Sequence, residues 1–413
     1  MKFDDLKLHP FLLKAVKDEG YITPTKIQEK AIPHILNKKD ILGSAQTGTG
    51  KTAAFALPIL HHMIVDKNKP SSFKRINVLV VTPTRELAIQ IGENFTTYSK
   101  YTDINNTVIF GGVKQIKQTD KLKKGVDILI ATPGRLLDLM SQGYISLKDI
   151  SYFVLDEADR MLDMGFINDI NKIIDKLPRQ RQSLFFSATM PNNILKLSNS
   201  ILNYPEKVSV HQTSATADTI DQLIYYTNKS DKRALLTDIL KNKVLSQVLI
   251  FSRTKHGADR LVKNLKKKNI AAVAIHGDKS QPQRQRALKS FKNKEVRVLV
   301  ATDIAARGID IDKLNFVINF DIPNEPETYV HRIGRCGRAG EKGQSISICE
   351  PEENMYAKDI EKLIKVSLTE IKNHKFPQTD LPMNPQQRKE FEKQKQKKKQ
   401  EFFANRKKNK RTK

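Results

Sequence analysis

The stretch ILGSAQTGTGKTAAFALPIL, residues 41–60, joins a short apolar run, a glycine-rich loop and a helix-like run in that order. The loop AQTGTGKT at Ala45–Thr52 follows Ile41–Leu42 and precedes Ala53–Leu60. Glycines in such a loop let backbone N–H groups approach phosphate oxygens, and the start of the following helix favours negative charge. Ala45 stands where the general pattern has its first glycine, while the other positions agree. The stretch predicts a phosphate-binding loop between a strand and a helix, although so short a motif can also match by chance.

Individual positions of this loop have separate roles in binding a nucleotide. Lys51 is expected to reach the β and γ phosphates, and the Thr52 hydroxyl is expected to bind Mg²⁺. The other positions that we expect around the nucleotide are Ala45, Gln46, Thr47, Gly48, Thr49 and Gly50.

An acidic motif, DEAD at Asp156–Asp159, directly follows the apolar run Tyr152–Leu155. Open α/β sheets bind ligands at the carboxyl ends of their strands, which is where we expect these carboxylates. Asp156 is the candidate Mg²⁺ partner, partly through water, and Glu157 is the candidate base that activates a water molecule. By itself the motif fits a surface turn or a helix cap equally well. The upstream loop favours the catalytic interpretation.

Short apolar runs alternate with longer amphipathic segments along most of the chain. Continuous hydrophobicity is typical of strands buried on both faces, which form parallel sheets covered by helices. The runs form two series: Val78–Val81, Val126–Ala131, Tyr152–Leu155 and Leu184–Phe186, then Val248–Phe251, Ala271–Ile275, Val296–Ala301 and Phe316–Phe320. The polar segment Tyr204–Asp221 separates the two series. We therefore expect α/β domains at residues 1–207 and 221–366, a linker at 208–220 and a tail at 367–413.

The composition limits the class of protein. A chain of 413 residues exceeds one ordinary domain, and 39% apolar residues suffice for sizeable cores. The net charge of +27 favours a polyanionic partner, nucleic acid first, with generic solubility as the alternative. Only Cys336 and Cys349 are present, which argues against a disulfide framework or a cysteine-based zinc site. The sequence shows no membrane-spanning run and no signal peptide at its start, so we expect a cytoplasmic protein without a membrane partner.

A series of motifs from about Phe3 to Leu363 resembles the DEAD-box RNA helicases. The motifs are GYITPTKIQ (20–28), AQTGTGKT (45–52), PTRELA (83–88), GG (111–112), TPGR (132–135), DEAD (156–159), SAT (187–189), ATDIAARGID (301–310) and HRIGRCGR (331–338). The resemblance implies two RecA-like domains that use ATP and Mg²⁺. Within this family, RTKHGAD (253–259) and DMGFINDI (163–170) are most similar to the bacterial RhlE-type group.

The resemblance also implies roles that the residue types alone do not. Gln28 is expected to read the adenine edge and Tyr21 to stack on the base, with Phe3 behind Tyr21. Without the resemblance, Gln28 would be interpreted as a polar helix residue and Tyr21 as a core aromatic. The other implied residues are Arg335 and Arg338 as arginine fingers, Asp310 at the ribose, and His331 as a link toward Ser187 and Thr189. Arg335 and Arg338 are three apart, so both can face one direction on a helix, or simply form a solvated basic face.

The candidate RNA contacts are small residues, glycines and arginines, which suit recognition of the sugar–phosphate backbone. They include no aromatic platform for base stacking, so little sequence preference is expected. In the first domain they are Pro83, Thr84, Arg85, Gly111, Gly112, Thr132, Pro133 and Arg135, and in the second Arg253, His276, Gly277, Gln281, Arg284 and Thr302.

The function that this resemblance implies is local unwinding of short RNA duplexes, or remodelling of RNA–protein complexes, coupled to closure of the two domains. Ribosomal precursors and the RNA-decay machinery are candidate partners. A non-unwinding RNA clamp and a DNA helicase are the alternatives. The segment Gln386–Lys413 holds 13 basic and 3 acidic residues, and we predict a disordered tail that serves as an RNA tether or as a solubilising segment.

Overall fold

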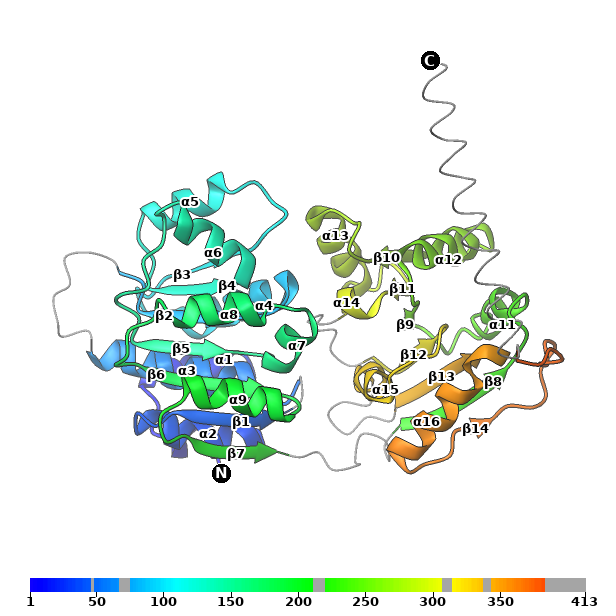
Figure 1. Cartoon of the computed structure of the whole chain (residues 1–413), viewed down its shortest axis with the longest axis horizontal. Coiled ribbons are helices and arrows are strands. Elements are labelled where there is room, and N and C mark those ends of the chain that lie inside the picture. The colour runs from blue at the N-terminus through cyan, green and yellow to red at the C-terminus, as the bar shows by residue number, and fades with distance from the viewer. Residues whose placement is uncertain (46–47, 67–74, 211–219, 307–313, 337–342, 383–413) are drawn as a thin grey trace, which may run out of the picture. The chain divides into compact units, whose positions relative to one another are not determined.

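The computed structural model describes residues 1–45, 48–66, 75–210, 220–306, 314–336 and 343–382, which form two compact units (Figure 1). The first unit holds the described residues up to Val210, and the second holds those from Ile220 onward. Each unit contains one seven-stranded parallel sheet with helices packed against it. No helix in these described ranges is long and apolar enough to cross a membrane.

The first sheet has the strand order β3-β4-β2-β5-β6-β1-β7. Its strands are β1 (Ile41–Ala45), β2 (Val78–Val81), β3 (Asn106–Ile109), β4 (Ile128–Ala131), β5 (Tyr152–Leu155), β6 (Gln182–Ser187) and β7 (Glu206–Val210). Its helices are η1 (Phe3–Leu6), α1 (Pro10–Asp18), α2 (Lys26–Leu36), α3 (Lys51–Val65), α4 (Arg85–Tyr98), α5 (Ile116–Lys123), α6 (Pro133–Ser141), α7 (Ala158–Asp163), α8 (Ile167–Ile174) and α9 (Asn192–Ile201).

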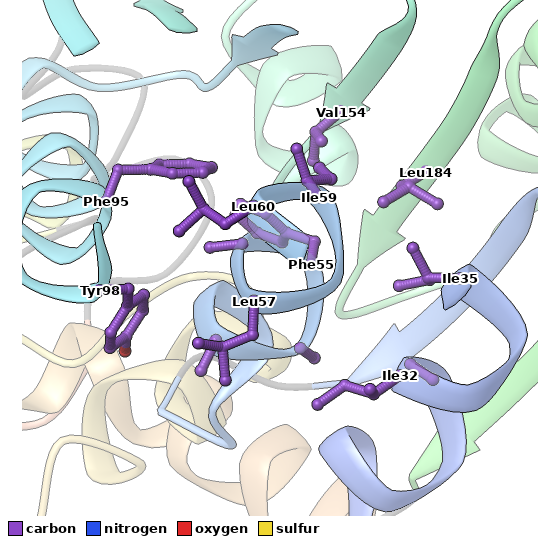
Figure 2. Packing of buried hydrophobic residues seen from close by; sticks show 14 of the residues in the cluster. Ile32, Ile35, Phe55, Leu57, Ile59, Leu60, Phe95, Tyr98, Val154 and Leu184 are labelled. Atoms are coloured by element: carbon purple, nitrogen blue, oxygen red, sulfur yellow. The ribbon is translucent and has the colours of Figure 1, made fainter. Parts of the chain in front are cut away.

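Two hydrophobic clusters lie on opposite faces of this sheet. Alternate residues of each central strand join one cluster or the other: Val154 packs with α2, α3 and α4, whereas Leu155 packs with α6 to α9. Figure 2 shows side chains of α3 between those of α4 and α2. Because both faces are covered, β2, β4 and β5 are apolar throughout, as the continuous runs in the sequence predicted.

Phe186 of β6 packs across the neighbouring strand β1. The two strands are in register with Gly43 opposite Phe186, and the Phe186 ring lies 5.7 Å from the ring of Phe55 in α3. A β-carbon at Gly43 would lie 2.4 Å from Cδ1 of Phe186. Glycine at residue 43 therefore makes room for the aromatic ring that joins β1 and β6 to the first helix after the phosphate loop.

The second sheet repeats the same arrangement, with the order β10-β11-β9-β12-β13-β8-β14. Its strands are β8 (Ile220–Tyr226), β9 (Val248–Phe251), β10 (Ala272–Ile275), β11 (Val298–Ala301), β12 (Phe316–Asn319), β13 (Gly343–Cys349) and β14 (Thr369–Glu370). Its helices are α11 (Lys232–Ile239), α12 (Lys255–Lys267), α13 (Gln281–Lys292), α14 (Asp303–Ala306), α15 (Pro326–Ile333), η4 (Pro351–Glu353) and α16 (Asn354–Ile364). The two parallel sheets flanked by helices confirm the predicted fold class.

Two expectations about segment ends need correction. Strand β7 runs to Val210 and pairs with β1, so the first sheet extends past the boundary expected at residue 207. Strand β14 pairs with β8, and Thr379 bonds to Asn228, so residues 367–382 of the expected tail pack on the second unit. Polar edge strands of this kind lack the continuous apolar run that marked the central strands. The rest of the linker, 211–219, and the tail from residue 383 lie outside the described residues.

Gly43→Ala is expected to destabilise the first unit by about 1–3 kcal/mol, because the added methyl group must displace a fully buried ring. Urea unfolding followed by circular dichroism measures the change. Gly134→Ala is the matched control, since a β-carbon at Gly134 meets no atom within 4 Å among the described residues. Equal stability of the two variants would contradict the packing argument.

Candidate functional site

The strand order brings the motifs of the first unit to one edge of its sheet. The carboxyl ends of parallel strands meet at the same edge, so the loops that follow them are neighbours. In sheet order these loops carry Gly111–Gly112 after β3, Thr132–Arg135 after β4, Pro83–Arg85 after β2, Asp156–Asp159 after β5, Ser187–Thr189 after β6 and Ala45–Thr52 after β1. The acidic motif therefore lies between the phosphate loop and the loops expected to hold RNA.

The phosphate loop ends in a left-handed turn that starts α3. Gly48 and Gly50 have φ angles of 81° and 92°, a conformation that glycine adopts without steric cost. The buried Lys51 begins the helix; its Nζ donates to the Ala45 carbonyl at 2.9 Å and lies 3.8 Å from Oδ1 of Asp156. The lysine thus spans the loop and reaches the acidic motif. Gln46 and Thr47 lie outside the described residues.

Gln28 holds the phosphate loop from the side of α2. Its Nε2 donates to the Gly50 carbonyl at 3.1 Å, and its Oε1 accepts from the backbone N–H of Thr25 at 2.8 Å. A β-carbon at Gly50 would lie 2.5 Å from this Nε2. The amide is therefore fixed against the backbone of the loop, and its role at the adenine edge stays a prediction.

Tyr21 lies at the surface of the first unit, with Phe3 beside it. The two ring centroids are 6.1 Å apart, and the Tyr21 hydroxyl is 3.3 Å from the hydroxyl of Tyr98. Tyr21 is 40% exposed, whereas Phe3 is buried. Tyr21 is thus partly exposed with a second ring beside it, and its stacking on a base remains a prediction.

Asp156 is a buried carboxylate with little to neutralise it. Burial raises the pKa of Asp156 to about 6, and the nearby Lys51 ammonium only partly opposes this effect. Oδ1 accepts no hydrogen bond from the part of the chain that the structure describes. A divalent cation fits such an oxygen, because it supplies the missing positive charge. The described residues contain no group of three His, Cys, Asp or Glu side chains that could hold a metal ion, so such a cation needs ligands of other kinds.

Glu157 adopts a strained conformation at the start of α7. Its φ of 59° lies in the left-handed region, which costs a non-glycine residue of the order of 1 kcal/mol. Its Oε2 accepts from Nη1 of Arg160 at 2.6 Å, and both side chains are buried. Strain of this kind persists only where the surroundings fix it, and here the ion pair with Arg160 holds the carboxylate beside Asp156.

Asp159, which we did not predict as a site residue, connects the acidic motif to the end of β6. Its Oδ2 accepts from the backbone N–H of Ala188 at 3.1 Å, from that of Thr189 at 2.9 Å and from the Thr189 hydroxyl at 3.0 Å. In return, the Ser187 hydroxyl accepts from the backbone N–H of Asp159 at 3.2 Å. The sequence contained a signal in the form of a second aspartate in the DEAD motif, but the partners of this aspartate lie about thirty residues away.

In the other loops at this edge of the first sheet, arginine side chains pack against backbone groups. The Arg85 guanidinium packs on Gly112, where a β-carbon would lie 2.3 Å from Nη1. Arg135 Nη2 donates to the Val113 carbonyl at 3.3 Å. Thr84 caps α4 by accepting from the backbone N–H of Leu87. The candidate RNA contacts of this unit are thus brought together, and glycine at residue 112 is needed for the approach of Arg85.

In the second unit the candidate RNA contacts also follow neighbouring strands. Arg253 follows β9, Gly277 follows β10 and Thr302 follows β11, with Gln281 and Arg284 in the first turn of α13. His276 is buried with Nε2 3.1 Å from the Asp259 carboxylate. The Arg253 guanidinium donates to the Ile322 carbonyl at 2.8 Å and to Glu353 at 2.7 Å. The Arg253 guanidinium therefore bonds to groups of its own unit, and its contact with RNA stays a prediction.

The placement of Arg335 on a helix with Arg338 is wrong. Helix α15 carries His331 and ends at Ile333, and Arg335 lies in the following turn, where its N–H bonds to the Arg332 carbonyl at 3.1 Å. Gly334 caps the helix, so the chain turns before Arg335. Arg338 and Asp310 lie outside the described residues. Arg332 was not predicted; it is buried and forms a bidentate pair with Asp303 at 2.6 and 2.9 Å.

Asp159→Ala is expected to destabilise the first unit by about 2–3 kcal/mol, because two backbone N–H groups and a hydroxyl lose their acceptor. Chemical denaturation of the full chain, followed by fluorescence of a dye that reports exposed apolar surface, measures it. Asp163→Ala, an exposed carboxylate at the end of the same helix, is the control. Shifts of the same size for both variants would rule out a stabilising role for these bonds.

Models of two protein families match this chain. Residues 25–197 match the DEAD/DEAH box helicase family, and residues 231–340 match the helicase conserved C-terminal domain. The first match lies in the first unit, and the second contains the candidate RNA contacts and Arg335 of the second unit.

Similar proteins extend the match over most of the chain. The ATP-dependent RNA helicase CshA of Limosilactobacillus reuteri is 43% identical over 90% of this chain and 74% of its own length. The DEAD-box ATP-dependent RNA helicase RhpA of Helicobacter pylori is 43% identical over 85% of this chain and 70% of its own.

Solved structures show the same fold. Dbp5 of S. cerevisiae bound to RNA and ADP BeF3 has a TM-score of 0.78 and 32% identity, and the match covers 90% of this chain and 95% of that one. The DEAD-box helicase Mss116 bound to ssRNA and UDP-BeF has a TM-score of 0.81 at 29% identity, over 91% of this chain and 81% of that one. These matches, together with the motifs at the sheet edge, show that the chain belongs to the family of DEAD-box ATP-dependent RNA helicases.

Proposed function

We propose that this chain hydrolyses ATP while its two units close on single-stranded RNA, and that it thereby unwinds short RNA duplexes or remodels RNA–protein complexes. The observation that carries the proposal is the position of the acidic motif between the phosphate loop and the backbone-binding loops on one sheet edge. Asp159 ties that motif to Thr189 at the end of β6 by hydrogen bonds.

The phosphate loop and Asp156 are the proposed ATP and Mg²⁺ residues. The amide of Gln28 and the ring of Tyr21 bind the base, and the ammonium of Lys51 binds the phosphates. Asp310 binds the ribose. Asp156 and the Thr52 hydroxyl hold the cation, partly through water. A bound Mg²⁺ neutralises charge on the phosphate oxygens. The raised pKa of Asp156 and its unbonded Oδ1 support this assignment.

Hydrolysis needs a base for the attacking water and positive charge for the transition state. Glu157 takes up the proton of the water, and the Arg160 guanidinium orients its carboxylate through the pair at 2.6 Å. Arg335 and Arg338 supply the positive charge from the second unit, and His331 links them to Ser187 and Thr189. The strained backbone of Glu157 supports a functional rather than a merely structural role, because strain concentrates at active sites.

RNA binds along its sugar–phosphate backbone, with little sequence preference and with discrimination against DNA through the 2′-hydroxyl. The glycine backbone at residues 111–112 and the guanidinium groups of Arg85 and Arg135 support this mode. The RNA-bound structures of Dbp5 and Mss116 support RNA as the partner. Ribosomal precursors and RNAs of the decay machinery are the proposed substrates. Membership of the RhlE-type group is likewise proposed, on the segments 163–170 and 253–259, whereas the relatives above carry the names CshA and RhpA.

Glu157→Gln is expected to retain binding of ATP and RNA and to lose hydrolysis, because an amide cannot take up the proton. Phosphate release at saturating RNA measures turnover, and strand displacement from a short tailed duplex measures unwinding. Glu93→Gln, at an exposed position of α4, is the control. Turnover within threefold of the wild type would contradict the proposed role of Glu157. ATP hydrolysis by the wild type without strand displacement would instead identify an RNA clamp.

Arg335→Ala is expected to lower RNA-stimulated turnover by about a hundredfold or more, since a finger of this kind stabilises transition-state charge. ATP affinity should change little, because the phosphate loop is intact. Arg233→Ala, which removes an exposed guanidinium from α11, is the control. Because Arg335 is buried, thermal unfolding of each variant is measured alongside turnover. A folded Arg335→Ala protein with wild-type turnover contradicts the assignment.

A further inference from the structure

Helix α12 carries a straight row of basic side chains on its outer face. His256, Arg260, Lys263 and Lys267 are spaced by four, three and four residues, which places them along one side of a helix. All four are exposed. At about 1.5 Å per residue, the row is about 16 Å long. We call these four residues the α12 stripe.

The opposite side of α12 fixes the orientation of the stripe. Ala258, Leu261 and Leu265 are buried in the core cluster of the second unit, together with residues of β9 to β11. Three anchoring side chains over two helical turns prevent the helix from rolling on the sheet. The backbone of α12 therefore holds the four basic positions of the stripe in a fixed row.

The charges of the stripe are not neutralised by neighbouring carboxylates. Asp259 is the single acidic residue of α12, and it pairs with Lys279 at 2.8 Å and with His276 at 3.1 Å. Among the described residues, no carboxylate lies within ion-pair distance of Arg260, Lys263 or Lys267. Helix α16 differs, because its Lys362 pairs with Asp359 at 3.3 Å. A row of unpaired cations raises the local potential for a polyanion.

The stripe begins at the edge of the sheet where RNA contacts are proposed. Thr254, which caps α12, directly follows Arg253 at the carboxyl end of β9. Lys255 pairs with Asp278, next to Gly277 at the end of β10. Since α12 leads back from the end of β9 to the start of β10, its outer face runs away from that edge (Figure 1).

From this geometry we infer that the α12 stripe binds the phosphate backbone of duplex RNA that flanks the single strand held by the core. The inference rests on the proposed function and adds a second binding surface to it. The stripe contains no aromatic ring for base stacking, which favours contact with phosphates rather than with unpaired bases. A row of basic positions on a fixed helix matches the regular row of phosphates along a duplex better than the irregular path of a flexible strand. The basic segment Gln386–Lys413 is repelled by the stripe and does not suit it as an occupant.

The test compares the full chain with the triple variant Arg260→Gln, Lys263→Gln and Lys267→Gln. Glutamine keeps the length and the helix propensity of the side chains while removing three charges. The control is Lys358→Gln, Lys362→Gln and Lys365→Gln, which removes three exposed charges at or just after α16. Each protein is titrated, with a non-hydrolysable ATP analogue, against a single strand of about ten nucleotides and against a hairpin that carries the same strand as a tail.

The triple variant should bind the short single strand like the wild type. It should bind the tailed hairpin about tenfold more weakly or worse at moderate salt, and its logarithmic salt slope should fall by about 2–3, since each duplex phosphate contributes about 0.9. The α16 control should change neither. An unchanged hairpin affinity and salt slope, with core binding intact, overturns the stripe assignment but leaves the proposed function standing.

Two further outcomes separate the alternatives. A wild-type protein that binds neither RNA overturns both the proposed function and the stripe. Equal losses on the single strand and on the hairpin also overturn the duplex assignment, because they place the stripe within the core site. If the triple variant keeps hairpin binding but loses affinity for polyglutamate or for anionic phospholipid vesicles, the partner is an acidic protein or a membrane surface, and RNA is excluded.

Discussion

Burial of parallel strands on both faces is the constraint on which the rest of this structure depends. A parallel strand needs a crossover helix before the next strand, and right-handed crossovers cover both faces of the sheet. The central strands must then be mostly apolar, while the polar groups of functional use lie in the loops after the strands and in the helices beside them. Because all strands point the same way, the loops after them gather at one edge. For this reason, functional residues between positions 45 and 189 lie on a single surface, although no one loop is long.

The hydrogen bonds at that edge connect the nucleotide residues to one another. Gln28 fixes the backbone of Gly50, Lys51 spans from Ala45 to Asp156, and Asp159 reaches Thr189. These bonds fix the backbone of the phosphate loop and the position of Thr189 after β6. Charge is concentrated at the same place: the pKa of Asp156 is raised because burial outweighs the nearby ammonium. The edge is thus preorganised for a ligand that brings positive charge to Asp156.

The basic side chains of this strongly positive chain have different roles. Only their burial distinguishes one role from another. In the second unit Lys232 is buried against Glu353 at 2.8 Å, and Arg332 is buried against Asp303. These cations fix the ends of strands and helices to each other, and removing one partner leaves an uncompensated buried charge. Arg253 shares in this network through Glu353. Arg260, Lys263 and Lys267 of α12, by contrast, face solvent without such partners among the described residues and are available to a polyanion.

The sequence by itself determined the chemistry of the site and most of the central strands. Val78–Val81, Tyr152–Leu155 and Val248–Phe251 were predicted with the bounds that the structure gives, because burial on both faces leaves a continuous apolar run. The phosphate loop and the DEAD motif were found because their chemistry needs particular residues at fixed spacing. These signals are local, so no tertiary contact was needed to read them.

The tertiary structure alone decided the features that depend on distant partners. Strand β13 was missed because its Ser345 and Ser347 look polar, yet both are buried beside Asn319, whose amide lies within 3.5 Å of each hydroxyl. The role of Asp159 depends on Ala188 and Thr189, which come close only when β5 and β6 pair. Arg335 does not lie on a helix as expected, because α15 ends at Ile333. Local periodicity cannot report pairing between residues far apart in sequence, and that pairing is what the fold supplies.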